Sequence, residues 1–253
     1  MKINFLGTGT SQGVPVIACK CKVCSSLDFR DKRLRASVYI EVDGQSLVID
    51  SGPDFRHQIL RENITNLDAL IFTHEHKDHT AGMDDIRAFN YKDKRSMPIY
   101  GRESVLNQLK KEFSYIFENA HYPGIPQVDL VPITNQAFKI NNTEILPIEV
   151  LHYKLPVFGF RIHDFAYITD ANYISEEEQQ KLQNLDVLVL NALQKEPHLS
   201  HFTFDEAVAL SQKLNAKKTY FTHISHKLGT HREVSKELPA NIQLAYDGLK
   251  IEI

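Results

Sequence analysis

Residues 70–82, LIFTHEHKDHTAG, carry the densest group of metal-binding side chains in this 253-residue sequence. The apolar run Leu70–Phe72 is typical of a buried strand, and the ligand-type residues His74, His76, Asp78 and His79 follow it directly. A strand end is rigid and the loop after it is exposed, which suits a metal site. Imidazole and carboxylate groups bind zinc, manganese and iron. The stretch therefore predicts a metal centre, and a solvated polar loop is the alternative.

Three further residues are each the first titratable group after an apolar run elsewhere in the chain. His152 follows TEILPIEVL, Asp170 follows FAYIT and His223 follows KTYFT. Taken singly, a histidine at a strand end is more often an ordinary surface residue. Two metals need more ligands than residues 70–82 supply, so we expect these residues to complete a site for two divalent cations, zinc or manganese.

The spacing H-x-H-x-D-H of residues 74–79 resembles the motif of the metallo-β-lactamase superfamily. The resemblance covers essentially the whole chain, from FLGTGTSQGVP to the last strand. It implies an α/β (α+β layered) fold, a four-layer αβ/βα sandwich of two mixed sheets with helices outside, as one hydrolase domain over residues 1–253. It also implies a ligand set: His74, His76 and His152 for one metal, Asp78, His79 and His223 for the other, Asp170 between them, and Asp50 in contact with a ligand.

Two of these positions narrow the chemistry that the resemblance implies. The diiron flavoprotein branch typically has glutamate where this chain has His76, so a dizinc or dimanganese hydrolase is favoured. True β-lactamases lack a bridging carboxylate at the position of Asp170, so antibiotic hydrolysis is disfavoured.

Three cysteines lie close together in ACKCKVC, residues 18–24. The spacing of Cys19, Cys21 and Cys24 points three thiolates into one volume and leaves a tetrahedral zinc one ligand short. We expect His226 to be the fourth ligand of a structural zinc, with His231 as the competing candidate. Free thiols, or a redox pair with a spare cysteine, are the alternatives.

The cysteine loop beside GTGTSQGVP narrows the resemblance to the cyclic phosphodiesterases of phosphonate degradation by carbon-phosphorus lyase. The carrier-like proteins of pyrroloquinoline quinone biosynthesis share the cysteine site but typically lack the full catalytic set. The implied activity is hydrolysis of a small phosphate diester resembling a ribosyl 1,2-cyclic phosphate, by a hydroxide that bridges two metals.

The stretch PHLSHFTFDEA, residues 197–207, offers a group that contacts the substrate. His201 lies just before Thr203, the predicted N-cap of a helix over residues 203–214, so its ring can face an anion near the helix N-terminus. Related branches have a histidine in an H-x-[ST] setting near the phosphate. We expect His201 and Asp78 to be the catalytic residues, with His198 as an accessory or alternative contact.

Other functions of the same fold stay open. A tRNA 3′-processing endonuclease is disfavoured because the net charge is −3 and residues 91–96, YKDKRS, are a short basic patch rather than an arm. A thioester or lactone hydrolase and a non-catalytic carrier are further alternatives. We expect a cytoplasmic protein without a signal peptide or membrane segment. Residues 113–122, FSYIFENAHY, are expected to be exposed and to offer a surface for a homodimer.

Hydrophobic periodicity predicts the remaining elements. An Asp43-Gly44 hairpin turn is expected between the second and third strands. Strands are predicted at residues 3–6, 37–42, 46–49, 70–72, within 138–169, and at 186–190, 218–222, 243–246 and 249–253. Helices are predicted at residues 55–62, 84–88, 104–117, from 175 onwards, and at 203–214.

Overall fold

The computed structural model describes residues 1–118 and 124–253, and within them the chain forms two seven-stranded sheets. The strand order is β14-β1-β2-β3-β4-β5-β6 in the first sheet and β13-β12-β11-β10-β9-β8-β7 in the second. The strands are β1 Lys2–Gly7, β2 Ser37–Val42, β3 Gln45–Ile49, β4 Ala69–Ile71, β5 Met97–Gly101, β6 Val128–Pro132, β7 Phe138–Ile140, β8 Thr143–His152, β9 Leu155–Ile162, β10 Phe165–Tyr167, β11 Val187–Asn191, β12 Lys218–Thr222, β13 Ile242–Leu244 and β14 Lys250–Glu252.

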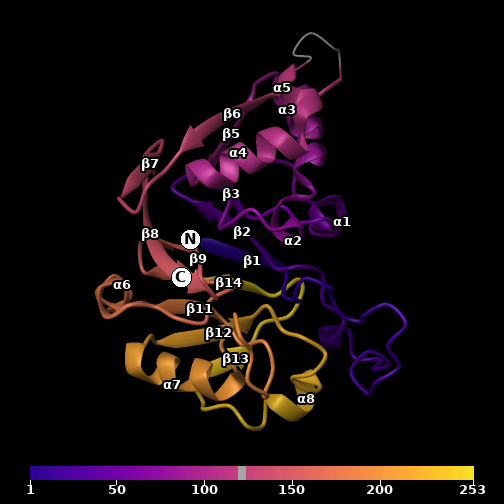
Figure 1. Cartoon of the computed structure of the whole chain (residues 1–253), viewed down its shortest axis with the longest axis vertical. Helices are drawn as coiled ribbons and strands as arrows, with labels where there is room; N and C mark the ends of the chain where they lie inside the picture. Colours follow the sequence, from indigo (N-terminus) through magenta and orange to yellow (C-terminus); the bar gives the residue numbers. More distant parts are fainter. Residues whose placement is uncertain (119–123) are drawn as a thin grey trace.

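Helices cover the outer face of each sheet, which gives the four layers expected from the sequence (Figure 1). Helices α1 to α5 lie on the first sheet, and α6, α7 and α8 lie beside the second. The helices are η1 Phe29–Asp31, α1 Phe55–Arg61, α2 Lys77–Thr80, η2 Met83–Ile86, α3 Arg87–Asp93, α4 Glu103–Glu112, α5 Ser114–Glu118, α6 Glu176–Gln180, α7 Phe204–Leu214 and α8 His231–Val234. The prediction of an α/β layered sandwich with two mixed sheets is confirmed.

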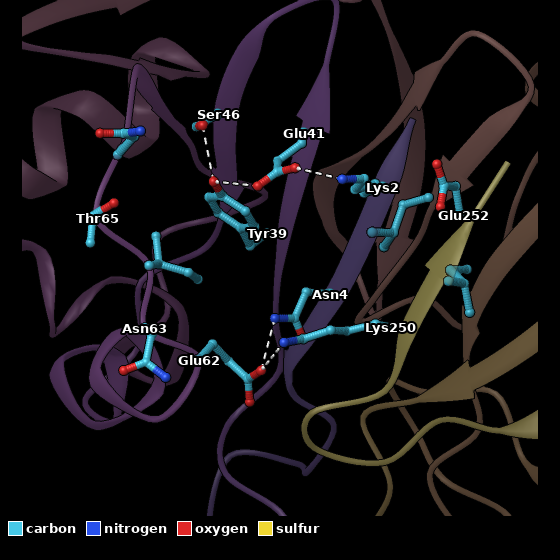
Figure 2. Close-up of a pocket in the computed structure, with 14 residues that line it drawn as sticks. Lys2, Asn4, Tyr39, Glu41, Ser46, Glu62, Asn63, Thr65, Lys250 and Glu252 are labelled. Carbon is cyan, nitrogen blue, oxygen red and sulfur yellow. Dashed lines mark hydrogen bonds and ion pairs between the residues drawn. The ribbon is translucent and has the colours of Figure 1, made fainter.

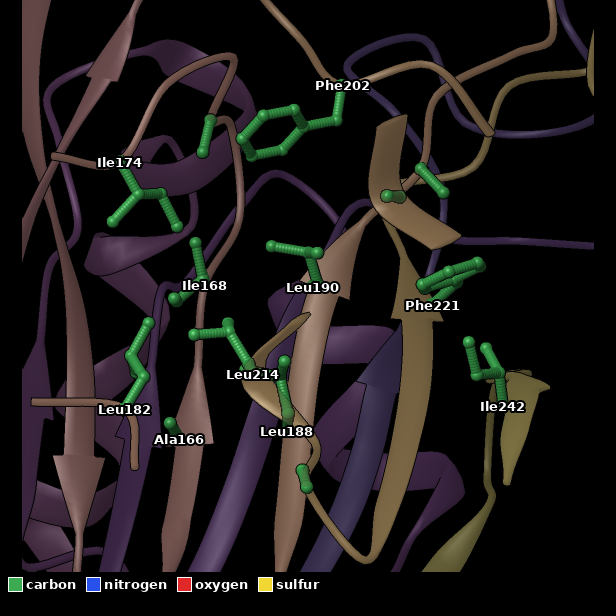
Figure 3. Packing of buried hydrophobic residues seen from close by; sticks show 14 of the residues in the cluster. Ala166, Ile168, Ile174, Leu182, Leu188, Leu190, Phe202, Leu214, Phe221 and Ile242 are labelled. Atoms are coloured by element: carbon green, nitrogen blue, oxygen red, sulfur yellow. The ribbon is translucent and has the colours of Figure 1, made fainter. Parts of the chain in front are cut away.

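Alternation of side chains along the strands produces separate apolar cores. One core lies between the sheets and joins residues of both, such as Phe5 of β1 and Phe160 of β9. Another lies under α7, where Leu214 packs with Leu190 and Phe221 from the strands (Figure 3). Burial of each such side chain contributes roughly 1.5–3 kcal/mol, so both faces of each sheet stabilise the fold.

Parallel pairing places the site. β3, β4, β5 and β6 are parallel neighbours in the first sheet, and β10, β11 and β12 are parallel neighbours in the second. The carboxyl ends of parallel strands share one edge of a sheet, and ligands of open α/β sheets bind at that edge. Asp50 follows β3, Asp170 follows β10 and His223 follows β12.

Local sequence signals account for several boundaries. The Asp43-Gly44 turn joins β2 to β3 with positive φ at both residues, 50° and 77°, as a two-residue hairpin requires. Helix α7 begins with a capping box between Thr203 and Glu206, as predicted.

Other boundaries differ from the prediction. The helix expected over residues 104–117 is two helices, because Phe113 leaves helical geometry with φ −111° and ψ 39° and buries its ring. The helix expected over 84–88 is the 3-10 turn η2 followed by α3. Strands β5 and β6 were not predicted.

The expectation that residues 113–122 form an exposed surface holds only in part for the residues that the structure describes. Phe113 and Ile116 are buried in the core under α4, and Tyr115 is partly exposed. Residues 119–122 of this stretch lie outside the described residues. The described part of the segment therefore gives no support for a homodimer.

None of the described helices combines the length and apolar character needed to cross a membrane.

Candidate metal centre

The stretch 70–82 forms a short turn from strand to helix. Strand β4 ends at Ile71, His76 occupies the N-cap position of α2, and Asp78 and His79 lie on that four-residue helix. The turn is tight enough to aim the histidine and aspartate side chains at one place.

One group of potential ligands consists of His74, His76 and His152, each offering an atom within 4.8 Å of the others. The Nδ1 atoms of His74 and His152 each contact a residue outside this group. His152 Nδ1 donates to the carbonyl of Ser200 at 2.9 Å, which leaves its Nε2 lone pair free. His74 Nδ1 lies 2.9 Å from the hydroxyl of Thr73. Such contacts fix the orientation of a ligating imidazole.

A second group consists of Asp78, His79, Asp170 and His223. His79 Nε2 lies 3.1 Å from Asp78 Oδ2 and 3.2 Å from Asp170 Oδ2. His223 Nε2 lies 3.3 Å from Asp170 Oδ1. Both Nε2 atoms are buried and lack a hydrogen-bond partner among the described residues. Buried imidazole nitrogens that face carboxylates without hydrogen-bond geometry fit a shared cation.

Asp50 orients His79 through the ring nitrogen Nδ1. Its carboxylate is fully buried and accepts hydrogen bonds from Thr73 N at 2.9 Å, from the Thr73 hydroxyl at 2.8 Å and from His79 Nδ1 at 2.7 Å. A carboxylate can only accept, so His79 keeps a proton on Nδ1, and Nε2 is the nitrogen left to bind a cation in place of a proton. The contact expected for Asp50 is present.

His201 lies against the second group rather than projecting beyond the helix N-terminus. Its Nε2 is 3.1 Å from Asp170 Oδ1, and its ring stacks on that of His223 with centroids 4.9 Å apart. His201 also forms a third ligand-type group with His152 and Asp170. The more exposed His198 contacts His201, with 3.1 Å between the two Nδ1 atoms. The two histidines of this segment therefore lie side by side next to Asp170.

The cysteine loop converges on one histidine. Sγ of Cys19, Cys21 and Cys24 lie 3.3, 3.5 and 3.4 Å from His226 Nδ1. The three thiols are free, and the backbone N–H groups of Val16 and Cys24 point at sulfur atoms of the group. The Cys24 amide lowers the pKa of Cys21 to about 6, while burial raises that of Cys24 to about 11.

His231, the competing ligand, faces other partners. Its Nδ1 lies 3.3 Å from an Arg33 guanidinium nitrogen, and its backbone N–H donates to Asp31 at 2.7 Å. The structure thus groups His226, and not His231, with the three cysteines.

A short backbone segment connects the two sites. Ile224, between His223 and His226, donates its N–H to the carbonyl of Thr8 at 2.9 Å and accepts from the N–H of Thr10 at 3.2 Å. The root of the cysteine loop is therefore paired with the segment that carries a candidate ligand of each site.

A family model described as a beta-lactamase superfamily domain matches residues 45–224. The chain belongs to the metallo-β-lactamase superfamily. The match covers Asp50 and both ligand groups, which run from His74 to His223, and it excludes the cysteine loop. Family membership and the paired ligand groups make the chain a metal-dependent hydrolase, and the fold implies divalent metals.

Individual relatives of the superfamily give finer comparisons. A crystal structure of a diphosphatase from the PhnP family superposes with a TM-score of 0.93 and 42% identity, covering 100% of this chain and 97% of that one. An octanoyltransferase from Porphyromonas gingivalis is 36% identical over 99% of this chain, but the chain spans about half (51%) of that protein. Zn²⁺-bound PqqB from Methylobacterium extorquens, with TM-score 0.80, 17% identity and full coverage of both chains, shares the fold.

Electrostatics in this superfamily member favour ionised carboxylates at the centre. Burial disfavours the charged forms of Asp78 and Asp170. Attraction to the neighbouring histidines, His79 and His223, outweighs burial and holds the pKa of both carboxyl groups below the usual range. Burial lowers the pKa of His79, and the charges of Asp170, Asp78 and Asp50 reverse this and raise it well above its usual value. This concentration of negative charge favours a divalent cation.

His201 stays neutral near pH 7. Burial lowers its pKa to about 4, although the hydrogen bond to Asp170 opposes the shift. A neutral imidazole that contacts Asp170 through Nε2 donates from that nitrogen and accepts at Nδ1, where it meets the Ser200 hydroxyl at 3.0 Å.

A hollow of about 450 Å³ opens at the opposite edge of the first sheet and takes no part in this centre (Figure 2). It lies by the start of β1 and the end of β14. Its charged side chains largely pair with one another: Glu62 accepts from Asn4 at 3.0 Å and from Lys250 at 3.1 Å. No sequence pattern predicts this hollow, because its residues come from segments far apart in the chain.

Proposed function

We propose that the chain is a dinuclear-metal hydrolase that cleaves a phosphorus–oxygen bond in a small phosphate diester, such as a cyclic ribosyl phosphate. The observation that carries the proposal is the position of Asp170. Its two oxygens face His79 and His223 of the second ligand group. Asp170 also lies within ligand distance of His152, which belongs to the first group, so a single carboxylate can reach both groups. A carboxylate shared by two metals would hold them close together, as two-metal hydrolysis of a phosphate diester needs.

In this proposal His74, His76 and His152 hold one metal, and Asp78, His79 and His223 hold the other. Asp170 lies between them. Zinc or manganese bound there would polarise the phosphate and lower the pKa of a water molecule. Cys19, Cys21, Cys24 and His226 would hold a separate structural zinc without an open position. Residues 1–253 would act as one domain, because one core joins both sheets.

The remaining groups of the site bind and orient. His201, neutral and buried, would exchange its Nε2–H contact with Asp170 for a hydrogen bond to a phosphate oxygen or to the departing alkoxide. Asp78 would share the transfer of a proton while it binds metal. Asp50 and the Ser200 carbonyl keep His79 and His152 in the tautomer that a metal needs.

A diphosphate linkage is the second candidate bond. The 42% identical structure is that of a diphosphatase, and this favours a substrate with two linked phosphoryl groups. Both candidates need the same metals and the same attack at phosphorus. They differ in the leaving group, which is an alkoxide for a diester and a phosphate for a diphosphate.

Two alternatives have less support. Residues 91–96 form the end of α3 and the turn into β5, and not a protruding arm, which disfavours tRNA processing. The activity named for the Porphyromonas octanoyltransferase belongs to a protein of which this chain spans about half, so we do not carry it over.

The test combines metal counting with turnover. Protein purified without chelator is analysed for metals per chain and assayed with bis(p-nitrophenyl) phosphate, a ribosyl cyclic phosphate and a nucleoside diphosphate. His76→Ala is compared with His163→Ala, an exposed histidine paired with Asp43 on a distant turn. About three metals per chain and diester turnover that only His76→Ala abolishes would support the proposal.

Two other outcomes would redirect it. Turnover of the diphosphate alone would replace the diester by the second candidate. A single metal that survives in His76→Ala but is lost in Cys21→Ala, without turnover of any substrate, would make the chain a zinc-stabilised binding protein.

A further inference from the structure

The shortest polar contact of Asp170 is made by the residue before it. The Thr169 hydroxyl donates to Asp170 Oδ2 at 2.6 Å, and both residues are buried, with exposed fractions of 0% and 2%. The contacts of Asp170 with His79, His201 and His223 are longer, at 3.1–3.3 Å. A short O–H···O⁻ bond is among the stronger hydrogen bonds in proteins.

This bond distinguishes the two oxygens of the carboxylate. Oδ2 accepts the hydrogen bond from the Thr169 hydroxyl and also faces His79. Oδ1 faces His201 and His223. The terminal torsion of an aspartate is broad, so backbone geometry alone does not fix the plane of the carboxylate. The hydrogen bond from the Thr169 hydroxyl supplies that constraint.

No second hydroxyl takes over this contact among the described residues. The Tyr167 hydroxyl, two positions earlier on β10, is fully buried and lies near the Thr169 side chain, but it makes no hydrogen bond of good geometry to any described residue. Because Thr169 is itself fully buried, solvent cannot replace its hydroxyl without a rearrangement.

A matched residue shows that packing at such a position does not by itself require the hydroxyl. Thr222 precedes His223 at the end of β12, as Thr169 precedes Asp170, and it is also fully buried. Its hydroxyl has no hydrogen-bond partner among the described residues. The two threonines share burial and chain position and differ in whether the hydroxyl contacts a candidate ligand.

We infer that Thr169 is a positioning residue whose hydroxyl sets the orientation of the carboxylate joining the two ligand groups. The inference rests on the proposed dinuclear centre. It assigns to Thr169 no contact with substrate. Partners that orient metal ligands typically change metal affinity by about 10- to 100-fold when they are removed.

The experiment compares Thr169→Val, Thr169→Ser and Thr222→Val. Zn²⁺ affinity is measured by competition with a chromophoric chelator, and kcat and KM are measured with bis(p-nitrophenyl) phosphate. Unfolding of the metal-free proteins by urea reports stability separately. We expect Thr169→Val to lose about 10- to 100-fold in Zn²⁺ affinity at the dinuclear site. Thr169→Ser and Thr222→Val are expected to stay within about threefold of wild type.

Three results would overturn the inference. The first is wild-type Zn²⁺ affinity in Thr169→Val. The second is a loss of Zn²⁺ affinity in Thr169→Ser as large as in Thr169→Val, because serine keeps the hydroxyl and the cause would then be side-chain shape. An equal loss in Thr222→Val would make the effect general to buried threonines. If Thr169→Val does not fold, Thr169→Ser against Thr169→Ala isolates the hydroxyl. Absence of metal at the dinuclear site in wild type would instead refute the proposed function itself.

Discussion

Replacing Asp50 by asparagine should invert the tautomer of His79 while nearly preserving shape. In Asp50→Asn the side-chain oxygen can still accept from Thr73 N, which places the new NH2 where Oδ2 now accepts from the Thr73 hydroxyl and from His79 Nδ1. An NH2 group donates, so His79 Nδ1 must become the acceptor and its proton moves to Nε2. That nitrogen faces Asp78 and Asp170, so the metal loses a ligand.

The size of the effect follows from the bond that is lost. A hydrogen bond to a charged group contributes about 1.5–3 kcal/mol. Each 1.4 kcal/mol is a tenfold change in a binding constant, so the metal affinity of the dinuclear site should fall by about 10- to 100-fold. Chelator competition measures the affinity, and long-range 1H–15N spectra of the ring nitrogens identify the tautomer.

Asp31→Asn is the matched control, because Asp31 is equally buried and accepts hydrogen bonds from Ser26 and from the backbone of His231, outside the two ligand groups. It should leave the metal affinity of the dinuclear site unchanged. If Asp50→Asn retained wild-type affinity, or if His79 kept its proton on Nδ1, the orientation argument would be refuted.

Three further predictions concern the rest of the chain. Cys21→Ser should bind one metal fewer per chain, and its melting temperature should fall less than that of the wild type when a strong chelator is added, as measured by metal analysis and thermal unfolding. Thr203→Ala removes the cap of α7 and should cost about 1 kcal/mol of unfolding free energy in urea titrations; a cost near zero would contradict the capping role. Burial, reinforced by the charge of Arg33, lowers the pKa of His231 from 6.5 to about 4, so the wild type should lose stability as the pH falls from about 6.5 towards 4. His231→Gln should flatten that part of the pH profile, and an unchanged slope would refute the assignment.

The local sequence predicted four residues of the two ligand groups because they are contiguous in the chain. His74, His76, Asp78 and His79 follow a single strand, and the order of apolar and ligand-type residues is enough to expect a site there. His152, Asp170 and His223 were expected from the same rule, because the ends of strands meet at an edge of a sheet. The structure brings all of these residues together, while their metal roles stay predictions.

Features that depend on distant pairing could not be predicted in this way. The sequence favoured His226 over His231 beside the cysteines, but what separates the two histidines is the pairing of Ile224 with Thr8 and Thr10 and the burial of Arg33 beside His231. The break at Phe113 follows from the core that its ring enters, against a continuous helical periodicity. The turn of His201 towards Asp170 likewise depends on how two strand ends approach each other, which helix capping alone does not determine.

The pairing of Ile224 with Thr8 and Thr10 sets a rule for exchanging parts between homologues. Because the spacing from His223 to His226 is three residues and its middle is held by two backbone hydrogen bonds, neither histidine can shift along the chain alone. A cysteine loop transplanted from another protein would need its own partner segment, equivalent to residues 222–226, to be transplanted with it. The unit of exchange in this fold is thus a pair of segments that are more than two hundred residues apart in the sequence.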